Sequence, residues 1–66
     1  MWARPWPNGQ GWDVGETGEV VKLEDGLQVR IINEDGQIKA LFIPDPSLDP
    51  VRAVQRCWKK GKFEEQ

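Results

Sequence analysis

Apolar residues recur at every second position through the middle of the chain, which is the pattern of a half-buried β-strand. Three such runs, at about 18–24, 27–34 and 37–43, are separated by Glu24-Asp25-Gly26 and Glu34-Asp35-Gly36. Aspartate followed by glycine between two alternating runs is a strong signal for a β-hairpin. The pattern therefore predicts a three-stranded antiparallel meander.

The lengths of the two turns decide which side chains share a face, because a slip of one residue moves a whole apolar set to the other side. A three-residue loop that puts Gly26 in the left-handed conformation would pair Leu23 with Leu27. A two-residue second turn would pair Ile31 with Ala40. This register predicts one apolar face, made of Val21, Leu23, Leu27, Val29, Ile31, Ala40 and Phe42.

The last third of the chain has the period of an amphipathic helix. Asp49 is a favoured N-cap, Pro50 is favoured at the first helical position, and Gly61 is typical of a helix stop. A helix over about 50–60 is therefore predicted. It should cover the apolar face of the sheet, with Trp58 as the largest contributor. Its apolar arc consists of Val51, Ala53, Val54, Cys57 and Trp58.

These elements predict an α+β fold, in which a three-stranded meander packs against one C-terminal helix. Sixty-six residues are too few for a second core, so residues 1–66 should form a single small domain. Its parts would be an irregular arm rich in Trp, Pro and Gly at 1–16, a folded core at 18–60 and a frayed tail at 62–66. The segment Gly18–Leu27 resembles the opening of many SH3-like small barrels, so a closed SH3-like barrel is the alternative fold.

The residue inventory argues against catalysis and against a bound metal. The chain has no His and no Tyr, and Thr17, Ser47 and Cys57 are each the single residue of their type. No catalytic triad of the usual kind can be assembled from this set. One Cys without His makes a poor zinc site and cannot form an intrachain disulfide. We therefore expect a non-enzymatic protein without a cofactor or a metal.

Half of the aromatic residues lie in the N-terminal arm, namely Trp2, Trp6 and Trp12. They could cover the more polar face of the sheet as a second small core, because a chain of this size needs the buried area. They could also stay exposed as anchors for a protein partner, because Trp is enriched at binding hot spots. The second interpretation makes these three residues the candidate partner-binding site.

The charge changes sign along the chain. Residues 1–50 carry four basic and nine acidic side chains, whereas residues 51–62 carry five basic and no acidic ones. Such a stripe is either a solvated face whose last-turn cations complement the helix dipole, or a surface for the phosphates of nucleic acid. The cations on the polar arc of the predicted helix are Arg52, Arg56, Lys59 and Lys60.

Two features bear on the cellular compartment. No stretch approaches the roughly 20 apolar residues of a membrane span, and residues 1–7 lack the apolar run of a signal peptide. The lone Cys57, which the helical period places in the core, agrees with a reducing compartment. A cytoplasmic protein without a membrane partner is therefore predicted.

Two short segments, Val14-Gly15-Glu16-Thr17 and Gln28-Val29-Arg30-Ile31, resemble fragments of the carbon storage regulator family, whose members are small dimers that bind RNA. The resemblance implies a dimer that binds RNA. The chain departs from the family at Leu48-Asp49-Pro50, where the family has a basic residue before its C-terminal helix. A meander followed by one helix is also similar in topology to the arm-binding domains of phage-type integrases, and topology alone does not imply function.

The leading functional prediction is a small protein-binding or regulatory module that acts by occupying a surface, alone or as a homodimer. It rests on the missing catalytic inventory, the small core and the three tryptophans of the arm. One alternative is a nucleic-acid-binding protein that uses the basic face of the helix. Another is an accessory subunit of a larger complex.

Overall fold

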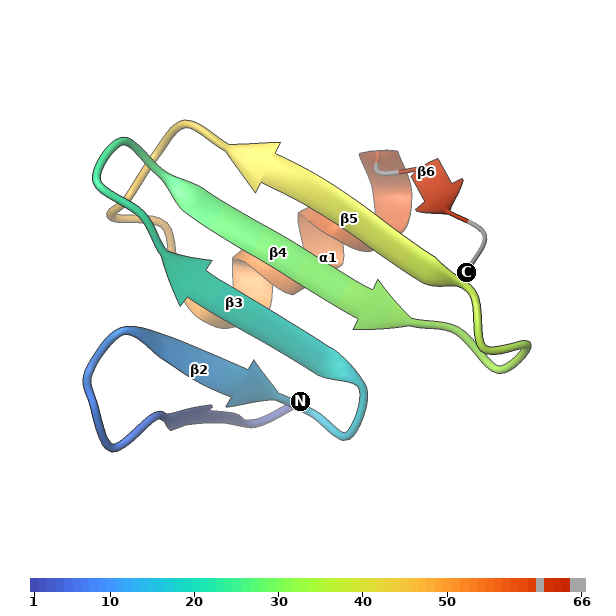
Figure 1. Ribbon diagram of the computed structural model, residues 1–66, viewed down its shortest axis with the longest axis horizontal. Helices are drawn as coiled ribbons and strands as arrows, with labels where there is room; N and C mark the ends of the chain where they lie inside the picture. The colour runs from blue at the N-terminus through green and yellow to red at the C-terminus, as the bar shows by residue number, and fades with distance from the viewer. Residues whose placement is uncertain (61, 65–66) are drawn as a thin grey trace.

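An antiparallel sheet of consecutive strands has one face covered by the C-terminal helix (Figure 1). The computed structural model describes residues 1–60 and, for the backbone alone, residues 62–64. The body of the sheet is formed by β1 (Ala3–Pro5), β2 (Gly11–Val14), β3 (Gly18–Lys22), β4 (Leu27–Ile32) and β5 (Ile38–Ile43). The helix is α1 (Pro50–Lys60), and a short strand β6 (Lys62–Glu64) pairs with β5. The predicted α+β fold with one C-terminal helix is confirmed.

The N-terminal arm forms the hairpin β1–β2 instead of an irregular segment, so the three predicted strands undercount the sheet. A hydrogen bond of 2.8 Å from the Trp6 N–H to the Gly11 carbonyl closes its turn. Gly9 takes a positive φ of 73° in this turn, and the Asn8 side chain accepts the N–H of Gln10. Because turn residues and short strands leave no apolar period, alternation alone does not predict this hairpin.

The central strand β4 turns its predicted side chains toward α1, whereas both neighbouring strands face the opposite way from the prediction. Leu27, Val29 and Ile31 of β4 are buried as expected. The residues that were predicted to face α1 but do not are Val21 in β3, Leu23 in the loop before β4, and Ala40 and Phe42 in β5. Phe42 is 42% exposed and Leu23 is 40% exposed, although both were predicted to lie in the core.

The first turn is one residue longer than predicted. Lys22 pairs with Leu27, so residues 23–26 form a four-residue loop and Val20 replaces Val21 on the covered face. Gly26 does not have a positive φ, contrary to the prediction. A Cβ atom on it would instead lie 2.2 Å from a backbone oxygen of β5. Glycine is therefore needed here for a close backbone approach and not for a left-handed conformation.

The second turn is also one residue longer than predicted. Ile31 pairs with Lys39, and the Asn33 N–H donates to the Gln37 carbonyl over 2.9 Å. The Asn33 side chain accepts the Gln37 N–H in return, while Gly36 adopts a φ of 80°. An Asn side chain that bonds the local backbone is a common way to fix a turn. These turn contacts favour the longer turn over the pairing of Ile31 with Ala40 on which the predicted register was based.

The helix α1 spans the predicted residues and packs on β3, β4 and β5. The Asp49 carboxylate caps it by accepting the N–H groups of Val51 at 3.0 Å and Arg52 at 3.3 Å. Trp58 is not the main contact that was predicted, because it is 39% exposed. The predicted stop at Gly61 lies outside the described residues. The side chains that α1 buries against the sheet are Ala53, Val54 and Cys57.

The sheet stays open, so the alternative of a closed SH3-like barrel is wrong. Among the described strands, β1 lies at one edge and β6 at the other, and these two edges do not pair. Residues 62–64, predicted to belong to a frayed tail, pair with β5. Residues 65–66 of that tail lie outside the described part of the chain.

Candidate functional site

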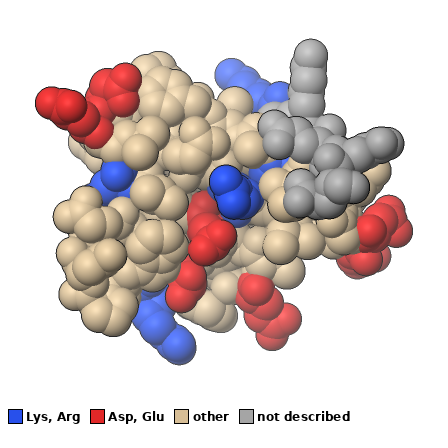
Figure 2. Space-filling model, in the orientation of Figure 1, with Lys and Arg blue, Asp and Glu red and all other residues tan. Residues whose placement is uncertain are grey.

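The face of the sheet turned away from α1 has no covering layer among the described residues, and we call it the open face. Successive side chains of a strand point to opposite faces, so the residues that alternate with the core lie here. Ile32 and Phe42 are 43% and 42% exposed on it. Figure 2 views this face and shows uncharged residues over most of it. Its apolar side chains come from Val21, Ile32, Ile38, Ala40 and Phe42.

A row of charged residues crosses the open face from β1 to β4. Along this row Arg4 pairs with Asp13, Asp13 with Glu19, and Glu19 with Arg30. Like charges directly opposite each other destabilise a sheet, so the Asp13–Glu19 pair has an energetic cost. Trp6 Nε1 donates a hydrogen bond of 2.9 Å to Asp13, which offsets part of that cost. The row thus places two carboxylates between two cations.

A depression with a volume of about 530 Å³ lies beside this row. Trp2 and Ile32 supply its apolar lining, and the carboxylates of Asp13, Glu16 and Glu19 stand near Arg30 in the rest. An aromatic ring, an aliphatic side chain and both signs of charge meet in one place. Such a combination of groups can contact the apolar and charged side chains of a polypeptide.

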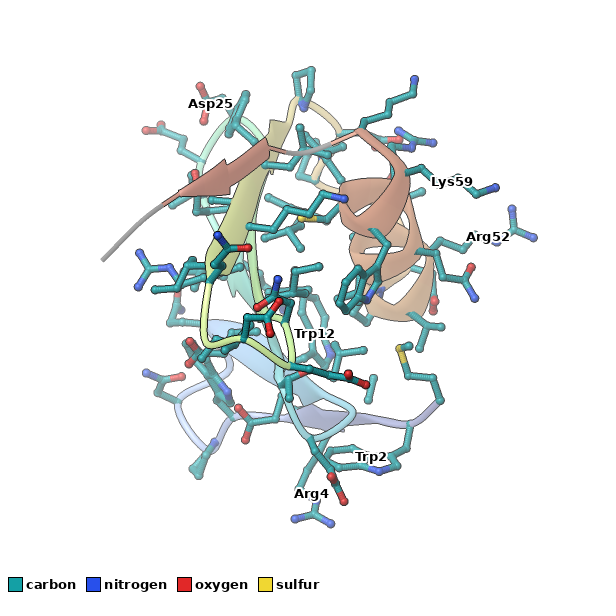
Figure 3. The ribbon with its side chains drawn as sticks, turned by 90° about the vertical axis from the view of Figure 1, so that its right-hand side faces the viewer. Trp2, Arg4, Trp12, Asp25, Arg52 and Lys59 are labelled. Atoms are coloured by element: carbon teal, nitrogen blue, oxygen red, sulfur yellow. The ribbon has the colours of Figure 1, made fainter. Side chains whose placement is uncertain are left out.

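The three arm tryptophans are divided between the two faces of the sheet. Trp12 packs against the core on the covered side, and Figure 3 shows it between the sheet and α1. Trp2 is 47% exposed, lines the depression and has the Arg4 guanidinium 5.1 Å from its ring centroid. Trp6 is half-buried against Gly11, where a Cβ atom would come within 2.8 Å of the ring. Only Trp2 of the predicted partner-binding residues is therefore largely exposed.

The four cations of the predicted basic stripe lie together on the solvent side of α1. A groove of about 320 Å³ runs between them, and its lining contains no carboxylate. Figure 3 shows Arg52 and Lys59 projecting from α1 on the side away from the sheet. We call this feature the basic groove, which is lined by Arg52, Gln55, Arg56, Lys59 and Lys60.

Lys39 of β5 is buried beneath α1 and only 6% exposed, whereas the predicted pairing of Ile31 with Ala40 leaves it on the opposite face. Its Nζ donates to the Trp58 carbonyl and lies 5.7 Å from the Trp58 ring centroid. This carbonyl belongs to the last turn of α1, so the ammonium meets the negative end of the helix dipole. No sequence signal marks Lys39, because its position follows from the register of β5.

The buried thiol of Cys57 lies next to this lysine. It donates to the Lys39 carbonyl over 3.6 Å and is fully buried. Burial raises the pKa of the Cys57 thiol, and the positive charge of Lys39 opposes that change to a smaller extent. A thiol kept protonated in this way is a poor nucleophile, so Cys57 has the properties of a core residue.

Among the described residues, no three His, Cys, Asp or Glu side chains gather into a set that could hold a metal ion. That part of the chain also contains no helix with the length and apolar character needed to cross a membrane. Comparison of the chain with protein-family models, curated proteins and solved structures found no match. The function therefore has to be inferred from the surfaces of the molecule itself.

Proposed function

We propose that the chain is a small, non-catalytic protein-binding module that binds its partner through the open face of the sheet. The observation that carries this proposal is the exposure of Ile32 and Phe42, at 43% and 42%, on a face that α1 leaves uncovered. Burial of the exposed part of each side chain against a partner would contribute about 2 kcal/mol at roughly 25 cal/mol per Å². These two residues lie at opposite ends of the β4–β5 pair, so they form two expected apolar contact points on the open face.

The charged row of the open face defines the partner's chemistry. A basic side chain entering the depression would relieve the repulsion between Asp13 and Glu19, and an acidic one would suit Arg30. Trp2 at the rim supplies an aromatic anchor of the kind found at binding hot spots. The expected partner is thus a polypeptide that offers apolar groups to Ile32 and Phe42 and charged groups to the row.

The β1 edge of the sheet suits a partner less well than the open face does. The edge strand β1 has only three residues and ends in Pro5, which has no N–H group to donate. Short edge strands that contain Pro resist the addition of another strand. This favours a partner that packs on the side chains of the sheet over one that extends it.

Photo-crosslinking from the open face tests the proposal. A photoreactive residue at position 32 or 42 should crosslink to a discrete protein in the native host. The same residue at position 23 is the matched control, because Leu23 is 40% exposed but lies in the loop between β3 and β4. Equal crosslinking from all three positions would count against the open face.

Binding measurements with the purified partner complete this test. Phe42→Glu should weaken the complex more than about 10-fold, because it puts a charge into an apolar contact. Leu23→Glu should change the affinity less than about twofold, since rim and distant surface changes have small effects. A crosslinked product of twice the mass of the chain would identify the partner as a second copy. Circular dichroism checks that both variants fold.

A further inference from the structure

The basic groove gives the molecule a second surface with a chemistry unlike that of the open face. All four of its charged residues are cationic and exposed, and Gln55 is its remaining lining residue. We propose that the basic groove binds the phosphate backbone of a nucleic acid, independently of the protein partner on the open face. Phosphate contacts made by Lys and Arg supply most of the affinity of sequence-independent nucleic-acid binding.

The ordinary role of cations at the end of a helix is already filled by another residue. Lysines in a last turn often complement the partial negative charge of the free carbonyl groups. In this chain Lys39 enters from the sheet and donates to the Trp58 carbonyl. Lys59 and Lys60 are therefore not needed for that role, and both remain exposed to solvent.

The spacing of the cations fits a linear polyanion. Arg52, Arg56 and Lys60 are four residues apart, so they follow one side of α1 at steps of about 6 Å and span roughly 12 Å. Each strand of a duplex carries one phosphate for about every 3.4 Å of helix axis, so this length spans three to four of them along the axis. With Lys59 beside the line, four phosphate contacts can form at once.

A membrane surface fits the groove less well than a nucleic acid does. A helix that lies on a bilayer needs an apolar side to insert among the lipids. The apolar side of α1 is used in the core, since Ala53, Val54 and Cys57 are at most 1% exposed. The helix cannot offer these residues to lipid while the sheet remains folded.

No carboxylate of the described side chains lines the groove. Figure 2 shows two acidic clusters at the ends of the sheet, where the turns contain Glu24-Asp25 and Glu34-Asp35. Asp45 does interact with Arg56, but the pKa of Asp45 is lowered mainly by hydrogen bonds from Ser47 and only slightly by that arginine. A protein of net charge −2 thus presents one surface that is purely cationic.

Fluorescence anisotropy over a salt series tests the proposal. The probes are a labelled single strand of about 20 nucleotides and the matching duplex, and vesicles containing phosphatidylserine serve as the lipid arm. Four phosphate contacts should give a slope of log K against log salt near −3 for the single strand or −4 for the duplex. No binding of either oligonucleotide at low salt, or binding to the vesicles alone, would overturn the proposal.

A matched pair of double variants locates the binding surface. Arg52→Gln with Arg56→Gln should weaken binding at least about 10-fold at low salt and reduce the slope by roughly 1.4 to 1.8. Arg4→Gln with Arg30→Gln removes the same charge from the open face and should change the affinity less than about threefold. Equal losses in the two double variants would show that net charge alone matters, which would contradict the assignment to the groove.

The outcome can be separated from that of the protein-binding proposal. The Arg52→Gln and Arg56→Gln protein should still crosslink from position 32, because neither arginine lies on the open face. Loss of nucleic-acid binding with intact crosslinking supports two independent surfaces. Loss of both would show that the groove and the open face serve one ligand, which would overturn the claim of independence.

Discussion

The open face and the basic groove lie on opposite sides of the molecule and are built in different ways (Figure 3). The open face gathers side chains from β1 to β5, whereas the groove comes from residues 52–60 alone. The first surface mixes apolar groups with both signs of charge, and the second is cationic. Apolar packing on the open face acts over short distances and depends little on salt. Attraction between the cations of the groove and an anionic ligand acts over longer distances and is screened by salt.

This contrast also shows what holds each surface in place. The open face depends on strand register, and therefore on the two turns and on the close approach at Gly26. The groove depends on α1, its Asp49 cap and the contact between Lys39 and its last turn. A substitution should accordingly damage one surface and leave the other almost unchanged.

The largest effect is expected for Gly26→Ala. The new Cβ atom would lie 2.2 Å from the Ile43 carbonyl oxygen and 2.8 Å from the Phe42 ring. The backbone of the loop or of β5 must move to relieve these contacts. Urea denaturation should therefore show a loss of about 3 kcal/mol in the free energy of unfolding. The displaced Phe42 ring should weaken partner binding, while the salt dependence of nucleic-acid binding stays the same.

Gly9→Ala is the matched control for this substitution. Gly9 has a φ of 73° but no atom within 4 Å of a Cβ position, so strain and not contact decides its cost. That cost should be about 1 kcal/mol. If Gly26→Ala proved no more destabilising than Gly9→Ala, the close approach between the β3–β4 loop and β5 would be refuted.

A smaller effect is expected for Lys39→Met, which keeps the apolar stem and removes the ammonium. The Trp58 carbonyl loses a donor, so the protein should be destabilised by about 1–2 kcal/mol. Amide hydrogen exchange should become faster in the last turn of α1 and stay unchanged in β3. Lys59→Met is the control, since Lys59 is exposed on the solvent side of α1. A more stable Lys39→Met protein would mean that the desolvation of the charge outweighs its contacts.

The smallest effect concerns pH and the Cys57 thiol, whose folded-state pKa is raised above the ordinary value of 9.0. The unfolded chain then releases this proton first as the pH rises. The contribution to stability is complete below the unfolded pKa and is lost as the pH rises through the folded pKa. The free energy of unfolding should thus fall more steeply above pH 9.0 in the wild type than in Cys57→Ala. Identical pH profiles would contradict this prediction.

The parts of the structure that depend on neighbouring residues could be predicted from the sequence. The bounds of α1 follow from Asp49, Pro50 and the helical period. The same period brought the four cations to one side of the helix, which is how they line the groove. Both features need only local geometry.

The faces of the flanking strands could not be predicted, because they depend on the exact length of each turn. One extra residue in each loop reversed β3 and β5 relative to β4, so Phe42 moved out and Lys39 moved in. Alternation of apolar residues does not indicate the Asn33 contacts that fix the second turn. Phe42 was missed as a residue of the open face for this reason, whereas Ile32 follows from the predicted facing of β4 and Trp2 was identified.

The sequential order of the strands has a consequence for synthesis of the protein. Each hairpin joins neighbours along the chain, so the sheet can assemble while later residues are still being added. Only α1 returns across strands made earlier, and it emerges after all of β1–β5. Until then Val29 and Ile31 have no cover, so apolar side chains are exposed on both faces of the nascent sheet. Docking of α1 should therefore be the step that protects the newly made sheet from aggregation.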